Sequence, residues 1–201
     1  MNLFAVISFI VWLYFLWAVH RAKLNFFQFL LGSVGTFIFL MIWVQPVVIT
    51  PLSRLVTSMA GMVGNWTGMF DVNYSYSFIF INYSGESISL YIDYECSGII
   101  EMMAFVSMLL FYQVYSVWQR VLLSAAGCVF ILFANVIRLL VICTMTYFGG
   151  SGVYYIAHTV IGRIVFYALS IALYYYVFTY SQIVRQKIGG VRYTEHSGRN
   201  L

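Results

Sequence analysis

Charged residues are scarce in this chain of 201 residues, which carries only 10 lysines and arginines and 6 aspartates and glutamates, or 8% of the sequence. Soluble domains carry about 25% charged residues, so the composition excludes an ordinary water-soluble fold. The few basic residues form short clusters between apolar runs. Nucleic-acid binding needs a concentrated basic face, so we expect no nucleic-acid partner.

Proline and the familiar catalytic and metal-binding motifs are also scarce or missing. Two prolines and 20% aromatic residues argue against collagen-like and disordered chains. The three cysteines, Cys96, Cys128 and Cys143, show no CxxC and no metal-ligand spacing, so we predict no metal site and no cofactor. The sequence contains neither GxSxG nor HExxH, which argues against serine-hydrolase and zinc-protease chemistry.

Long apolar runs are what the chain has in abundance, and a membrane-spanning helix needs about 20 mostly apolar residues. The first run has no basic residues before it and no small-residue cleavage site after it, so we interpret it as a retained span rather than a cleaved signal peptide. The predicted fold class is an α-helical polytopic membrane protein, a single domain over residues 1–201 with about five transmembrane helices. The predicted spans are Leu3–Val19, Phe26–Ile49, Gly98–Trp118, Val121–Tyr147 and Val153–Tyr180.

Basic residues in three connecting segments predict how the chain crosses the membrane. Five crossings place all three clusters on one side, and the positive-inside rule assigns that side to the cytoplasm. The N-terminus is then expected outside a cell membrane, residues 50–97 form an extracytoplasmic segment, and residues 181–201 form a cytoplasmic tail. The clusters are Arg21 and Lys23, then Arg120, then Arg185, Lys187 and Arg192.

The expected extracytoplasmic segment has two parts with different hydrophobic periods. Pro51–Gly64 begins with a proline and spaces its apolar residues as a helix does, which predicts a short interfacial amphipathic helix. Phe78–Ile81 and Ile88–Tyr94 are rich in β-branched and aromatic residues. With the turn sequence Ser84-Gly85-Glu86 between them, they predict a β-hairpin.

Three reactive or charged side chains, Cys96, Arg138 and His158, lie within or at the edge of the apolar runs. Ionisable groups inside a membrane are costly and usually functional. The predicted topology brings all three near the outer surface from three successive helices, and Asn135 shares a helix face with Arg138. A thiol, a permanent cation and an imidazole are the groups that thiol-based acyl transfer uses, so we expect a composite catalytic site.

Structural roles compete with these assignments. Cys96 could be a small apolar filler, as we expect Cys128 and Cys143 to be, and His158 could be a satisfied interfacial histidine. Arg138 could form a structural pair with Glu101 on the adjacent helix. Arg163, one span later, is a second potential partner for Glu101. We predict that Glu101 and Arg163 form the structural pair, which leaves Arg138 as the catalytic cation.

Three short blocks of sequence give the chain a specific resemblance. They are Glu95-Cys96-Ser97-Gly98, Asn135-Val136-Ile137-Arg138 and His158-Thr159-Val160-Ile161-Gly162. In their order, spacing and position on successive membrane helices, these blocks resemble the signature motifs of the exosortase/archaeosortase family. Within that family the chain is most similar to the short Gram-positive type called exosortase G.

The resemblance implies a membrane-embedded cysteine transpeptidase or peptidase that acts near the outer membrane face. Its partner would be an exported protein with a C-terminal sorting signal, made of a recognition motif, a hydrophobic span and a basic tail. Such an enzyme cleaves the signal and passes the protein to an acceptor. By the family pattern Cys96 is the nucleophile, His158 the acid–base and Arg138 the cation for the thiolate or oxyanion. Asn135, Glu101 and Arg163 are expected to support them.

Two function classes without this chemistry are the alternatives. A non-enzymatic membrane subunit of an envelope polysaccharide or protein export system would explain the fold, but it would leave three converging reactive groups without a role. A small transporter would usually show internal repeats or broken helices in matching positions, and the sequence has neither. Replacing Cys96 separates the enzymatic hypothesis from both alternatives.

Overall fold

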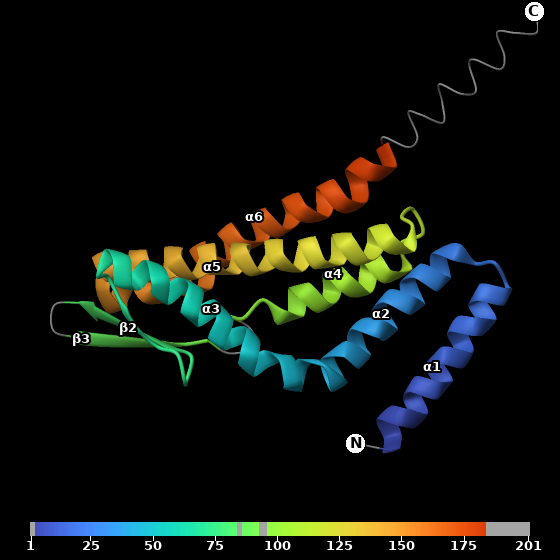
Figure 1. Cartoon of the computed structure of the whole chain (residues 1–201), viewed down its shortest axis with the longest axis horizontal. Helices are drawn as coiled ribbons and strands as arrows, with labels where there is room; N and C mark the ends of the chain where they lie inside the picture. The colour runs from blue at the N-terminus through green and yellow to red at the C-terminus, as the bar shows by residue number, and fades with distance from the viewer. Residues whose placement is uncertain (1–2, 84–85, 93–95, 184–201) are drawn as a thin grey trace, which may run out of the picture.

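Helices dominate the computed structural model, which describes residues 3–83, 86–92 and 96–183 (Figure 1). Four segments are long and apolar enough to cross a membrane, namely the first three helices and the segment Val117–Ile183. The chain is therefore a polytopic helical membrane protein with a small sheet, as predicted. Its elements in chain order are α1 (Leu3–Arg21), α2 (Asn25–Trp43), α3 (Gln45–Thr67), β1 (Asp71–Asn73), β2 (Phe78–Tyr83), β3 (Glu86–Tyr91), α4 (Ile99–Phe111), α5 (Val117–Ile156), η1 (Ala157–Ile161), α6 (Gly162–Tyr174) and η2 (Tyr175–Tyr180), the two η segments being π-helical.

Aromatic side chains hold α1 and α2 together as a helical hairpin. No residue of α1 is buried, so its apolar surface is left for lipid. The indole N–H of Trp12 donates to the Leu31 carbonyl of α2 at 2.9 Å, and a side chain at position 35 would collide with that indole. Phe9 meets Phe39 edge to face. This hairpin therefore depends on a few ring contacts rather than on a buried core.

The bounds predicted for the second span and for the interfacial helix are wrong. The second span was expected to run to Ile49, but α2 ends at Trp43, and after Val44 a separate helix of 23 residues, α3, begins at Gln45 and has Pro51 inside it. Pro46 stands in the first turn of α3, where a missing backbone N–H leaves no helical hydrogen bond unmade. The proline at the start of the helix is therefore Pro46 rather than Pro51, so the predicted helix began several residues too late.

A small antiparallel sheet follows α3 and confirms the predicted hairpin, to which the structure adds the short strand β1. The strand order is β1-β2-β3, and Phe78 pairs with Tyr91 while Ile81 pairs with Ile88. Ile79 and Ile81 of β2 are fully buried, whereas Phe80 between them is exposed, so the alternation expected of a half-buried strand is present. The central residues of the predicted turn, 84–85, lie outside the described residues.

The third predicted span is shorter than expected, and the fourth is longer. α4 ends at Phe111, and α5 begins directly after Ser116. The Ser116 hydroxyl accepts from the backbone N–H of Gln119, whose side chain accepts from the Ser116 N–H. This reciprocal capping box satisfies two N–H groups at the helix start, which explains why α5 begins at Val117 rather than Val121.

The chain reverses direction within the range assigned to α5, so that α5 and α6 lie antiparallel (Figure 1). Gly150 makes the reversal with φ 68° and ψ −164°, a conformation that only glycine adopts readily. The α1–α2 and α4–α5 connections lie at one end of the molecule, while the sheet and the α5–α6 reversal lie at the other end (Figure 1). The molecule therefore has a purely helical end and a mixed end, and Cys96 follows the sheet of the mixed end.

Candidate active site

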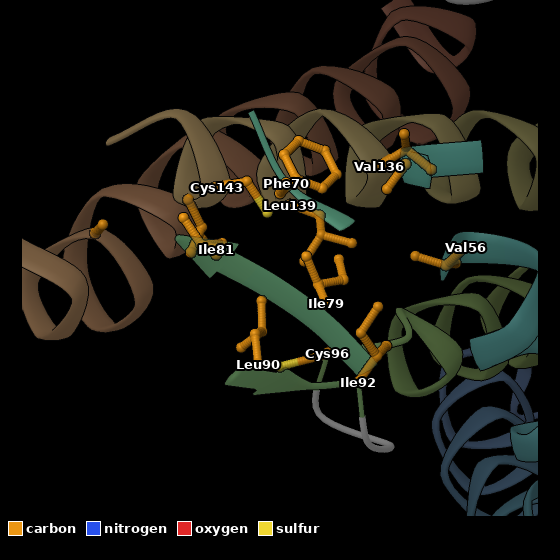
Figure 2. Close-up of a cluster of buried hydrophobic side chains, with 13 residues drawn as sticks. Val56, Phe70, Ile79, Ile81, Leu90, Ile92, Cys96, Val136, Leu139 and Cys143 are labelled. Carbon is orange, nitrogen blue, oxygen red and sulfur yellow. The ribbon is translucent and has the colours of Figure 1, made fainter. Parts of the chain in front are cut away.

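Cys96 lies between the last strand and α4, at the edge of the core of the mixed end. That core combines side chains from α3, the sheet and α5, and Figure 2 shows Cys96 at one side of it, beside Leu90 and Ile92. Only 8% of Cys96 is exposed. Two residues later Gly98 begins α4 with φ 76°, a left-handed conformation that favours glycine. The sharp turn at Gly98 thus sets Cys96 at the start of a helix.

The sulfur of Cys96 contacts an imidazole that lies far away in the sequence. The distance from Cys96 Sγ to His158 Nε2 is 3.3 Å, and 62 residues separate the two in the chain. A thiol and an imidazole at this distance can share a proton. The structure therefore brings together two of the three residues singled out from the sequence.

A widened turn of helix carries His158. Residues Ala157–Ile161 form the π-helical segment η1, and such insertions often occur at functional sites. The Tyr154 ring stacks on the imidazole with centroids 5.8 Å apart and planes inclined by 29°. Its hydroxyl is also within electrostatic range of the Cys96 sulfur. Sequence reasoning missed Tyr154, although an aromatic residue four positions before a histidine on a helix is a signal that could have found it.

Asn135 ties the nucleophile's backbone to α5. Its side-chain Nδ2 donates to the Cys96 carbonyl at 2.6 Å, and Asn135 itself is almost completely buried. The Cβ that a residue other than glycine would place at Gly98 comes within 3.5 Å of Asn135. The amide therefore packs directly under the turn that carries the thiol, as its predicted supporting role requires.

Arg138 is buried one helical turn after Asn135, with only 6% of its surface exposed. Its guanidinium lies over the Phe166 ring at 5.8 Å, a cation–π contact between α5 and α6. It is also close enough to act electrostatically on the Glu101 carboxylate of α4. Because residues three apart share a helix face, Arg138 belongs to the same side of α5 as Asn135. A permanent cation is thus buried one helical turn from Asn135, the residue that is bonded to the Cys96 carbonyl.

Glu101 and Arg163 do not form the structural pair that the sequence suggested. The Arg163 side chain is exposed on α6, whereas the cation that acts on Glu101 is Arg138. Helix spacing alone could not show which way Arg163 faces, because η1 precedes α6 and shifts its register. The geometry therefore links Glu101 to the candidate site through Arg138 and leaves Arg163 apart from it.

The remaining reactive groups lie outside this arrangement. No disulfide joins the three cysteines. Cys143 is buried in the core and Cys128 is half-buried on α5, in keeping with their expected role as apolar fillers. Over the described residues no group of three or more histidine, cysteine, aspartate or glutamate side chains could hold a metal ion. The chemistry that the site offers is therefore that of a thiol with an imidazole and a nearby cation.

Comparison with known proteins gives one match. A family model described as transmembrane exosortase matches residues 1–176, which is most of the chain and includes Cys96, Asn135, Arg138 and His158. The chain therefore belongs to the transmembrane exosortase family. No curated protein and no solved structure matches it significantly.

Proposed function

We propose that this member of the transmembrane exosortase family is a membrane-embedded cysteine transpeptidase. Its substrate is an exported protein with a C-terminal sorting signal made of a recognition motif, a hydrophobic span and a basic tail. The observation that carries the proposal is the 3.3 Å contact between Cys96 Sγ and His158 Nε2. A nucleophile and its base within hydrogen-bond reach are the signature of covalent catalysis.

The reaction proceeds through a thioester on Cys96. His158 Nε2 accepts the thiol proton as the sulfur attacks the carbonyl carbon of the scissile peptide bond. The C–N bond then breaks while the imidazolium returns the proton to the departing amine. An acceptor nucleophile next gives its proton to His158 and attacks the thioester, and the cysteine leaves and is reprotonated.

Arg138 supplies positive charge where negative charge develops, first on the sulfur and then on the carbonyl oxygen. Its burial makes this charge more effective, because electrostatic interactions are stronger away from water. Asn135 holds the Cys96 carbonyl at 2.6 Å, so it positions the nucleophile without touching the substrate. Tyr154 positions the imidazole through the stacked contact at 5.8 Å.

The site is proposed to act on the extracytoplasmic side of a cell membrane. The basic residues Arg21, Lys23 and Arg120 lie in or next to the connections at the purely helical end (Figure 1). The positive-inside rule assigns that end to the cytoplasm. Cys96 follows the sheet at the opposite end, which supports an outward-facing site, an outer N-terminus and a cytoplasmic C-terminus.

The test is co-expression with exported proteins that end in a hydrophobic span and a basic tail, with tail removal followed by immunoblot. We expect removal with the unaltered chain and none with Cys96→Ala. Cys128→Ala is the matched control, because this second cysteine lies on α5 away from the site and its loss should leave processing intact. Mass spectrometry should find the substrate joined to Cys96 through a thioester that hydroxylamine cleaves. Normal processing by Cys96→Ala would refute the enzymatic role and favour a non-enzymatic membrane subunit.

A further inference from the structure

An open groove of about 610 Å³ runs along α6 and η2 beside the start of α4. Its wall is mostly apolar and aromatic, and six of its seven residues belong to α6 and η2. The seventh, Glu101, comes from α4. The groove is lined by Glu101, Tyr167, Ser170, Ile171, Tyr174, Tyr175 and Thr179.

The groove begins next to the candidate active site. Glu101 lies in the first turn of α4, five residues after Cys96, and Arg138 acts electrostatically on its carboxylate. Glu101 in turn acts on the Tyr174 hydroxyl in the groove wall. Glu101 therefore lies within electrostatic range of Arg138 and also lines the groove.

From this end the groove follows the helix away from the sheet. Its wall extends from Tyr167 to Thr179, which corresponds to about 18 Å of helix rise. Beyond Glu101, Phe105 of α4 packs against Tyr174 of α6, and the hydroxyl of Tyr112, the residue after α4, donates to the Phe178 carbonyl of η2 at 2.7 Å. Tyr167, Ile171 and Tyr175 in the groove wall are exposed, and in a membrane-spanning helix such apolar surface meets lipid.

The wall of the groove also contains a charged acceptor. Glu101 places its carboxylate among the lining residues, within electrostatic range of the Tyr174 hydroxyl. A carboxylate accepts hydrogen bonds from backbone N–H groups, so a peptide occupant fits this wall better than an acyl chain, which has no donor.

We propose that the groove binds the segment of the substrate that follows the cleaved bond, including the first turns of its hydrophobic span. This inference rests on the proposed function and adds the place where the substrate lies. Where the residues just after the scissile bond are extended, their backbone N–H groups are free to donate to the Glu101 carboxylate. The apolar span then packs along Ile171 and Tyr175. A phospholipid fits less well, because its phosphate would lie against the Glu101 carboxylate.

Two adjacent tyrosines provide a matched test by photo-crosslinking. Tyr175 lines the groove, whereas Tyr176 does not, and both are exposed. Each is replaced in turn by p-benzoylphenylalanine in the Cys96→Ala background, which keeps the substrate uncleaved, and cells expressing a tailed substrate are irradiated. We expect a covalent adduct with the substrate span from position 175 and loss of that adduct at position 176.

Filling the groove gives an independent readout. Ser170→Phe should raise KM for the tailed substrate about tenfold, equivalent to about 1.4 kcal/mol of binding, whereas Ile164→Phe, on the exposed surface of α6 outside the groove, should leave KM within twofold. Alkylation of Cys96 by iodoacetamide should be unchanged in both variants, which would show that the site is still formed. Equal substrate adducts from positions 175 and 176, or adducts with lipid alone, would refute substrate binding in the groove. Neither result would affect the proposal that cleavage depends on Cys96. Processing that survives Cys96→Ala would instead overturn the proposed function itself.

Discussion

The two π-helical segments in the described part of the chain, η1 and η2, differ in which residues lie opposite them. η1 carries His158, whose imidazole meets the Cys96 sulfur at 3.3 Å. η2 presents backbone carbonyls instead, and the hydroxyl of Tyr115 bonds to the Val177 carbonyl at 2.6 Å in the same way that Tyr112 bonds to Phe178. The same irregularity of the helix thus serves a reactive side chain in one place and a structural hydrogen bond in the other.

This difference teaches that a π-helical turn does not by itself locate a catalytic site. The role of each π-helical segment depends on the residues opposite it. The cysteine that precedes α4 faces η1, whereas the tyrosines that follow α4 face η2. Changes at η1 should therefore reduce activity and spare stability, while loss of the tyrosine hydrogen bonds to the η2 carbonyls should do the reverse. The predictions below test this contrast, from the largest expected effect to the smallest.

The largest effect is expected at η1. His158→Ala removes the base that accepts the Cys96 proton, so kcat should fall by about 10²–10⁴-fold, the usual contribution of a positioned acid–base. Thermal unfolding in detergent should change little. The measurement is the rate of tail removal from a purified substrate. A His158→Ala variant that unfolds at a much lower temperature but retains its kcat would contradict the catalytic role assigned to η1.

Arg138→Gln should lower kcat by about 10²–10³-fold, because a buried charge that stabilises the developing anion is lost. Arg163→Gln is the matched control, since this arginine is exposed on α6 and should retain activity. Both rates are measured with the same substrate. Equal losses in the two variants would mean that the charge of Arg138 has no special relation to the site.

At η2 the expected effect is on stability. Tyr112→Phe and Tyr115→Phe each remove one hydroxyl donor to a carbonyl, so each should lower the free energy of unfolding by about 0.5–1.5 kcal/mol. Activity at low temperature should be unaffected. Equilibrium unfolding in mixed micelles gives the free energies, and tail removal gives the activity. A drop in kcat without loss of stability would contradict the structural role of these two hydrogen bonds.

The smallest effect is expected from the ring that stacks on the imidazole. Tyr154→Ala should reduce kcat several-fold, because an aromatic contact contributes about 0.5–1.5 kcal/mol, while Tyr154→Phe retains the stacking and most of the rate. The pH dependence of kcat distinguishes positioning from general destabilisation, because only a displaced imidazole changes that profile. An identical loss in the alanine and phenylalanine variants would assign the effect to the hydroxyl instead.

Much of this arrangement follows from local rules. The apolar runs predict a polytopic helical protein, and the alternation in Phe78–Ile81 predicts the hairpin. The convergence of Cys96 and His158 follows from topology, since both are expected at the outer ends of their helices. These features depend on hydrophobic period and chain direction, which a single sequence contains.

Other features depend on contacts that no local pattern encodes. The choice between Pro46 and Pro51 as a helix start depends on the packing of α3 against the sheet and α5. The link from Glu101 to Arg138 rather than Arg163 depends on the direction of side chains after the π-helical turn. The groove is a space between elements distant in sequence, so its existence could not be predicted from residue spacing.

The burial of Cys96 bears on the fate of the proposed thioester. A thioester exposed to bulk water can hydrolyse, which would release the protein instead of attaching it. Cys96 belongs to a buried cluster that includes side chains of the sheet and α5 and is only 8% exposed, and an enclosed site protects reactive intermediates from water. For the proposed thioester, we therefore expect the burial of the nucleophile to favour transfer to an acceptor over hydrolysis.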